Sequence, residues 1–133
     1  MSRVGSSILI VEDEPFIVES LRFLLEREGH TVQAVRDGAA AIAAIDRARP
    51  DLIVLDVMLP KRNGFEILKW VRGHRTVSDV PVLILTAKGQ DADRRKAEEF
   101  GVDAFVTKPF SNRDVIRQVT DLLAAGRAQA AAH

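Results

Sequence analysis

The chain contains no cysteine among its 133 residues, so it has neither a disulfide framework nor a thiolate site for a metal. It also has no net charge, because 19 basic and 19 acidic residues cancel. Without a basic excess, no overall field draws the protein onto nucleic acid or anionic lipid. We therefore expect no direct binding to nucleic acid.

Long hydrophobic runs are missing as well. No run approaches the length that crosses a bilayer, and the first five residues lack the apolar stretch of a signal peptide. We expect no membrane association and a cytoplasmic location. Hydrophobic residues make up 47% of the chain and charged residues 29%. This composition, together with the length of the chain, is typical of one globular domain.

Five short apolar segments, rich in β-branched residues, predict five strands. Three of them have the unbroken apolar character of strands buried on both faces, and the other two are typical of more exposed strands. The three buried segments are Ser7–Val11, Asp51–Asp56 and Val80–Thr86, and the two exposed ones are Thr31–Val35 and Ala104–Thr107.

Segments with the helical spacing of apolar residues alternate with these strands. The predicted helices are Pro15–Glu28, Gly38–Arg47, Gly64–Arg72, Asp91–Phe100 and a fifth that opens at Ser111 and ends at Leu123. Asp37 is the expected cap of the second helix, and Gly29 and Gly101 are expected to stop the first and the fourth. The Ala-rich residues 124–133 are predicted to form a frayed extension.

Strict alternation of strands and helices predicts an α/β fold, a doubly wound parallel sheet with helices on both faces, because parallel neighbours are joined by right-handed crossovers. We expect one domain over residues 7–123, with a short extension before it (1–6) and a tail after it (124–133). In such sheets ligands bind at the carboxyl ends of the strands.

Polar residues follow four of the five predicted strands at that edge, and the second strand contributes nothing comparable. They are Glu12 and Asp13 after the first strand, Asp56 at the third, Thr86 at the fourth and Lys108 after the fifth. Each alone is most simply a turn, cap or solvated residue. Their joint occurrence at one sheet edge is much less easily produced by chance.

Three converging carboxylates repel one another and are tolerated best around a hard cation, and oxygen-only ligation favours Mg²⁺. Mg²⁺ leaves coordination positions for phosphate oxygens, which suits phosphoryl transfer. Asp56 can act as the nucleophile that forms an acyl phosphate. Thr86 would then offer a hydroxyl, and Lys108 a cation, to the phosphoryl oxygens.

The motifs around these positions resemble those of a known family, the receiver domains of two-component response regulators. The motifs are Val11-Glu12-Asp13-Glu14, Asp56-Val57-Met58-Leu59-Pro60 followed by Gly64, Leu85-Thr86-Ala87, and Phe105-Val106-Thr107-Lys108-Pro109-Phe110. The resemblance covers essentially all of residues 7–123. It implies a five-stranded sheet with the flavodoxin-like order 2-1-3-4-5.

The resemblance also assigns the metal and phosphate ligands. Glu12 and Asp13 would hold Mg²⁺, Asp56 would accept the phosphoryl group beside the metal, and the backbone carbonyl of Met58 would be a further ligand. Thr86, Ala87 and Lys108 would contact the phosphate. The small side chain of Ala87 fits either access to the phosphate or simple close packing.

A switch is implied in the same way. Thr86 would swing toward the phosphate while Phe105 turns inward, which links phosphorylation to a distant surface. Taken without the resemblance, a phenylalanine near a strand end is most simply a core residue. The Lys108–Pro109 peptide bond would be cis, a form that is nearly confined to bonds before proline.

The implied function is a signalling switch with no independent turnover, phosphorylated by a sensor histidine kinase or a histidine phosphotransfer protein. If the chain is the whole protein, it would be a single-domain regulator that docks to a downstream protein. The alternative is a truncated receiver of a larger regulator. The other competing hypothesis is a Mg²⁺-dependent aspartyl-phosphate hydrolase, but such enzymes have a second acid two residues after the nucleophile, where this chain has Met58.

Members of this family often pair through the face made by the fourth helix, the fifth strand and the fifth helix, so the resemblance allows a weak dimer. Asp103 could serve such a face. Ala104, however, stands where a second acidic residue is common in DNA-binding relatives. A standard transcription-factor dimer is therefore disfavoured.

Overall fold

The computed structural model of the chain describes residues 5–57, 64–87 and 91–132. Strands and helices alternate along these residues, as predicted. The strands are β1 (Ser7–Val11), β2 (Thr31–Val35), β3 (Leu52–Asp56), β4 (Val82–Ala87) and β5 (Ala104–Lys108). The helices are α1 (Pro15–Arg27), α2 (Gly38–Arg47), α3 (Gly64–Gly73), α4 (Asp91–Glu99) and α5 (Asn112–Ala132).

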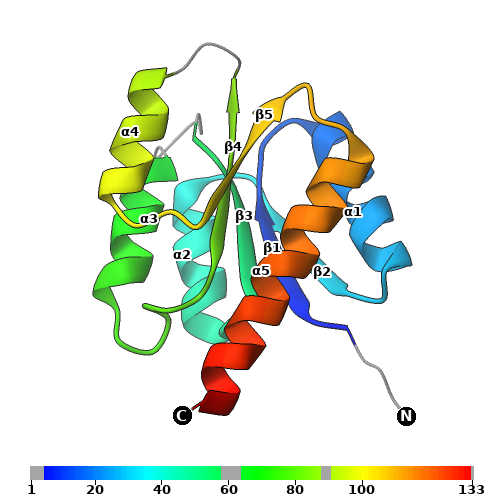
Figure 1. The fold of residues 1–133 in the computed structure, drawn as a ribbon. Coiled ribbons are helices and arrows are strands. Elements are labelled where there is room, and N and C mark those ends of the chain that lie inside the picture. Colours follow the sequence, from blue (N-terminus) through cyan, green and yellow to red (C-terminus); the bar gives the residue numbers. More distant parts are fainter. Residues whose placement is uncertain (1–4, 58–63, 88–90, 133) are drawn as a thin grey trace.

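All five strands run parallel in the order β2-β1-β3-β4-β5, which confirms the expected topology. Helices α1 and α5 cover one face of the sheet, and α2, α3 and α4 cover the other (Figure 1). The inner strand β3 is buried along its whole length, whereas the edge strands β2 and β5 are only partly buried. Their place at the edges explains why their sequences are less uniformly apolar.

Alternate residues of each strand supply two separate cores. On β1, Ile8 and Ile10 pack with residues of α1 and α5, while Leu9 and Val11 pack with residues of α2, α3 and α4. Burial on both faces fixes the register of the central strands, since a slip of one residue would exchange the two cores. The polar residues that follow these strands are thereby held at one edge.

The residues that were predicted to mark the ends of helices are also confirmed. The Asp37 carboxylate accepts a hydrogen bond from the Ala40 N–H at 2.9 Å and caps α2. The Ser111 hydroxyl accepts one from the Asp114 N–H at 3.1 Å at the start of α5. Gly29 and Gly101 have φ of +92° and +88°, the left-handed conformation that ends a helix without a side-chain clash.

Helix α5 differs from the prediction because it continues to Ala132 instead of ending at Leu123. The alanines that follow Leu123 have the highest helix propensity of any residue, so they extend a helix that is already nucleated. Although α5 has 21 residues, neither it nor any other helix in the described part of the chain is long and apolar enough to cross a membrane.

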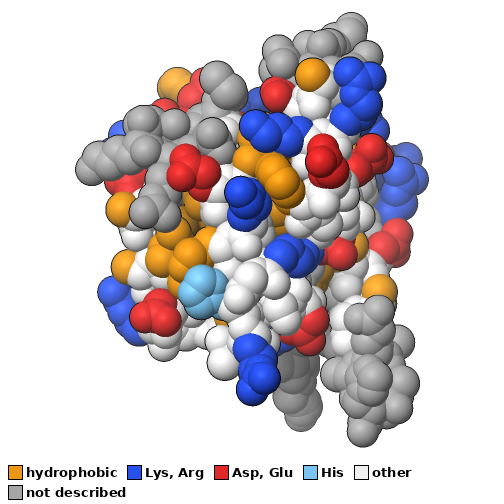
Figure 2. Space-filling view, turned by 90° about the vertical axis from the view of Figure 1, so that its left-hand side faces the viewer, with side chains coloured by type: hydrophobic (Ala, Val, Ile, Leu, Met, Phe, Trp, Pro, Cys, Tyr) orange, Lys and Arg blue, Asp and Glu red, His pale blue; other side chains and the backbone are white. Residues whose placement is uncertain are grey.

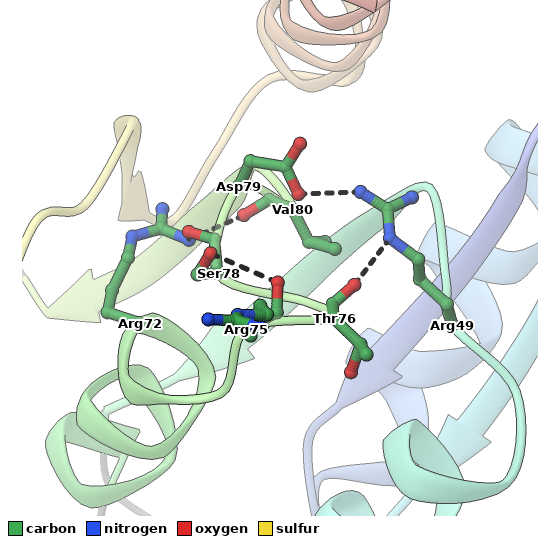
Figure 3. Close-up of polar contacts among 7 residues, drawn as sticks. All are labelled: Arg49, Arg72, Arg75, Thr76, Ser78, Asp79 and Val80. Carbon is green, nitrogen blue, oxygen red and sulfur yellow. Dashed lines mark hydrogen bonds and ion pairs between the residues drawn. The ribbon is translucent and has the colours of Figure 1, made fainter.

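An arginine that no motif predicted joins α3 to the two loops beside it, at the sheet edge opposite the polar residues. The Arg72 guanidinium donates hydrogen bonds to the carbonyls of Ser78 at 3.2 Å, Val80 at 2.7 Å and Gly101 at 2.9 Å. Figure 3 shows its contacts with the loop that leads into β4. One half-buried cation therefore ties this loop to α3 and to the loop that leads into β5.

Asp103 completes this cluster. Its Oδ2 lies 2.6 Å from Nη2 of Arg72 and accepts the Val82 N–H at 2.8 Å. The carboxylate of Asp103 is therefore already bound within the domain. The dimer role expected of this residue stays a prediction. On the other side of the same loop, Arg49 pairs with Asp79 at 2.7 Å (Figure 3).

Candidate functional site

The residues predicted to form the site lie at the carboxyl edge of the sheet, at the top of Figure 1. Asp56 is the last residue of β3 and is paired in register with Leu85, one residue before Thr86. Lys108 is the last residue of β5, opposite Ala87. Parallel pairing thus brings the polar residues at the carboxyl ends of β3, β4 and β5 close together.

Three carboxylates come together at this edge. One oxygen from each of Glu12, Asp13 and Asp56 can be chosen so that all three atoms lie within 4.8 Å of one another. Glu12 is completely buried and Asp56 is 6% exposed, whereas Asp13 is half-buried. The cluster therefore has two carboxylates inside the domain and one at its rim.

Lys108 bridges the two buried carboxylates. Its Nζ lies 3.1 Å from Oε1 of Glu12 and 3.3 Å from Oδ2 of Asp56. The angles toward Asp56 are those of a hydrogen bond, but those toward Glu12 are not. Oε1 of Glu12 is therefore a buried acceptor with an ion pair but no hydrogen-bond donor among the described residues.

Burial and charge shift the pKa values of both partners. Burial, together with the nearby negative charge of Asp56, raises the pKa of Glu12 to about 7, although the Glu14 N–H that donates a hydrogen bond to Oε2 at 3.1 Å opposes the shift. For Lys108, burial lowers the pKa, but the charges of Asp56 and Glu12 outweigh it, so the pKa of the ammonium group is raised above its ordinary value. Lys108 is thus held as a cation.

This donor set fits a divalent cation of the Mg²⁺ type. Its oxygens are all carboxylate oxygens, the ligands that hard cations prefer, and one of them is buried without a hydrogen bond. Three carboxylates against one ammonium group leave an excess of negative charge that a cation would neutralise. Met58, whose carbonyl was expected to be a further ligand, lies outside the described residues.

The remaining predicted residues lie beside this cluster. Thr86 is buried near the end of β4, with Thr107 as its register partner on β5. Phe105 is half-buried on β5, two residues before Thr107. The Lys108–Pro109 peptide bond is cis. Ala87 ends β4 beside Lys108, but its side chain is not described.

Two residues near the site were missed as contributors. Arg36 directly follows β2, the strand that was expected to contribute nothing, and lines an open cavity of about 230 Å³ together with Glu12, Asp13 and Glu19. The sequence did contain a signal for Arg36, because it is a charged residue directly after a strand, like other residues of the site. Gly64, named only as part of a motif and as the start of a predicted helix, packs against the backbone of Asp56 with no room for a Cβ.

A parallel doubly wound sheet with an acidic cluster and a lysine at its carboxyl edge belongs to the class of α/β domains that bind ligands at the ends of their strands. The chain belongs to the response regulator receiver domain family, whose model matches residues 8–120. It is thus a receiver domain of two-component signalling, as the motifs indicated.

Relatives of known name agree with this assignment. The chain is 41% identical over 121 residues to the sensory transduction protein RegX3 of Mycobacterium tuberculosis, covering 91% of this chain and 52% of that protein. It is 42% identical over 120 residues to the alkaline phosphatase synthesis transcriptional regulatory protein PhoP of Bacillus subtilis, covering 90% and 49%. The chain therefore spans about half the length of these relatives.

Solved structures give the same result. The chemotaxis response regulator CheY4 of Vibrio cholerae has a TM-score of 0.85 at 27% identity, over 90% of this chain and 99% of that one. The receiver domain of the sensor histidine kinase PA1611 from Pseudomonas aeruginosa has a TM-score of 0.84 at 29% identity, over 91% and 99%, and holds a magnesium ion in its active-site cleft.

Proposed function

We propose that this domain is a phosphorylation-dependent switch that accepts a phosphoryl group on Asp56 with the help of Mg²⁺. The single observation that carries the proposal is the cluster of Glu12, Asp13 and Asp56, whose ligand atoms lie within 4.8 Å of one another beside Nζ of Lys108. The magnesium ion in the PA1611 receiver domain supports the choice of metal.

In the proposed reaction, a carboxylate oxygen of Asp56 attacks the phosphorus of the donor. A P–O bond to Asp56 forms, the bond from phosphorus to the donor breaks, and the leaving group takes the electron pair of that bond. Lys108 stabilises the negative charge of the phosphoryl oxygens, and its raised pKa keeps it protonated for this role. Thr86 would offer its hydroxyl to another phosphoryl oxygen.

Glu12 and Asp13 are the proposed protein ligands of Mg²⁺, with Asp56 and the carbonyl of Met58. When bound, the metal would neutralise charge on the phosphoryl group and the carboxylates. The open cavity beside Glu12 and Asp13 leaves space for water next to the ion, in keeping with the tendency of Mg²⁺ to retain bound water.

The proposed donors are a sensor histidine kinase or a histidine phosphotransfer protein, and the output is binding of a downstream protein. Phosphate would shift the equilibrium between two conformations of Thr86 and Phe105, because it binds one of them better. The names of RegX3 and PhoP refer to sensory transduction and transcriptional regulation in those longer proteins. A weak dimer through α4, β5 and α5 is a further proposal.

Incubation with acetyl phosphate tests the acceptor directly. In the presence of Mg²⁺ we expect the intact mass to rise by one phosphoryl group, and we expect no rise with a chelator or in Asp56→Asn. Asp46→Asn is the matched control, since this exposed aspartate of α2 lies away from the strand ends. A phosphoryl adduct that persists in Asp56→Asn would refute the assignment.

The same incubation separates a switch from a hydrolase. A receiver is expected to take up one phosphoryl group without sustained turnover of phosphate esters. Continuous release of phosphate from a small ester, abolished in Asp56→Asn and retained in Asp46→Asn, would support the hydrolase instead.

A further inference from the structure

Cations lie over aromatic rings across the face formed by α3, α4 and β5. Lys96 of α4 lies over Phe65, with Nζ 4.9 Å from the ring centroid, and Arg94 of α4 lies over Phe105, with its Cζ at 4.8 Å. Figure 2, which looks onto the α3 and α4 side, shows Lys and Arg side chains among hydrophobic ones. Both distances are within the range of a cation–π interaction.

The pair formed by Arg94 and Phe105 differs from the other because Phe105 lies on β5, beside the strand that carries Thr86. Phe105 is paired in register with Ile84, and both belong to the core beneath α2, α3 and α4. Thr86 follows Ile84 by two residues, so strand alternation puts it on that face as the diagonal neighbour of Phe105. Arg94 thus lies over a ring whose diagonal neighbour on the sheet is Thr86.

The backbone of Phe105 is fixed, so its ring is the part that can move. Its carbonyl accepts a hydrogen bond from Nε2 of Gln118 on α5 at 3.2 Å, and its strand pairs with β4 along its full length. A phenylalanine ring has no hydroxyl with which to hold a surface position by hydrogen bonding. The guanidinium of Arg94 supplies an attraction that favours the half-exposed ring.

We propose that Arg94 is a positioning residue that holds the Phe105 ring in its resting, half-exposed place and thereby sets how readily phosphorylation shifts this domain. This proposal rests on the proposed function and specifies the regulation of the same site. When Phe105 turns inward it leaves Arg94, so the cation–π contact stabilises the unphosphorylated conformation. Loss of the contact makes the inward position more accessible.

The size of the effect follows from the strength of such a contact. Exposed cation–π pairs are worth about 0.5 to 1 kcal/mol, which corresponds to roughly a two- to five-fold change in an equilibrium constant. Arg94 is exposed, so we expect its replacement to leave the fold intact. Arg95, the next residue of the same helix and also exposed, provides a control with an identical change of net charge.

The test compares Arg94→Gln with Arg95→Gln by NMR of protein carrying ¹³C-labelled phenylalanine, with Phe105→Leu used to identify the ring signal of Phe105. In the resting protein we expect Arg94→Gln to displace that signal toward its position in the phosphoryl-like state, and Arg95→Gln to leave it unchanged. Beryllofluoride with Mg²⁺, a mimic of the phosphoryl group, should then bind Arg94→Gln about two- to five-fold more tightly. Arg94→Lys, which retains a cation, should lie between the two.

Each result decides the proposal. An unmoved Phe105 signal in resting Arg94→Gln would overturn it, and so would equal effects of Arg94→Gln and Arg95→Gln, which would indicate net charge alone. If beryllofluoride binds none of the proteins, the proposed function fails, and the resting Phe105 signal by itself then decides whether Arg94 positions the ring.

Discussion

Substitution of Gly64 tests whether the start of α3 fixes the position of the proposed phosphoryl acceptor. A Cβ at this residue would lie 2.6 Å from the carbonyl oxygen of Asp56 and 2.9 Å from Cα of Val57. Ordinary contact begins at 3.4 Å, so the oxygen and the new carbon must separate by about 0.8 Å. Since both obstacles are backbone atoms, no side-chain rotation can relieve the clash.

The expected cost of Gly64→Ala is therefore that of overpacking, about 1 to 3 kcal/mol in the free energy of unfolding. For a domain of this size, each kcal/mol lowers the melting temperature by about 4 °C. Displacement of Asp56 should also slow phosphorylation by acetyl phosphate, by about tenfold or more, because misplacement of a reacting group by about 1 Å is enough to cost that much.

Gly73, the last residue of α3, is the matched control. A Cβ there meets nothing within 4 Å, and its φ is not positive. Both substitutions change the entropy of the unfolded chain in the same way, so their difference isolates the steric contribution. Thermal unfolding and the phosphorylation rate are measured for both variants; equal stability and equal rates would refute the role of Gly64.

Three further predictions concern the metal, a loop and a helix end. Because the pKa of Glu12 is raised to about 7, a proton competes with Mg²⁺ for this carboxylate below that pH. We expect the dissociation constant of Mg²⁺, measured by calorimetry, to rise about tenfold from about pH 8 to about pH 6. This pH dependence should disappear in Glu12→Gln. Arg72→Ala should lower the free energy of unfolding in urea by about 1 to 3 kcal/mol, chiefly because three carbonyls lose a donor, since the pair with the partly exposed Asp103 adds little. Arg49→Ala, which removes an exposed pair, should cost less than about 1 kcal/mol in the same assay, and equal losses would contradict the distinction. Asp37→Ala should cost about 1 kcal/mol in thermal unfolding through loss of the α2 cap, and no loss would show the cap to be dispensable.

The strand order and the helix boundaries could be predicted because each rests on local chemistry or on the family motifs. Unbroken apolar runs require burial on both faces, and strict alternation with helices leaves a parallel sheet as the solution. Single residues such as Asp37 and Gly29 then mark the helix ends. The end of α5 was wrong because alanine propagates a helix without adding any pattern of burial.

The convergence of Glu12, Asp13, Asp56 and Lys108 was predicted from their common place after strands. The distances were not, since they depend on register and on how far each side chain reaches. Arg72 could not be found in the same way, because its partners are backbone carbonyls from two loops, and a carbonyl leaves no mark in a sequence. Arg94 was hidden in a charged run, where one cation is indistinguishable from its neighbours until the ring of Phe105 is placed beside it.

Locating the phosphoryl group is the most direct measurement of what this domain does. Protein treated with acetyl phosphate and Mg²⁺ is reduced with borohydride, which converts an aspartyl phosphate to homoserine, and the digested peptides are sequenced by mass spectrometry. We predict homoserine at position 56 and at no other aspartate. Homoserine at Asp13, or none at any position while the protein binds Mg²⁺, would contradict Asp56 as the acceptor.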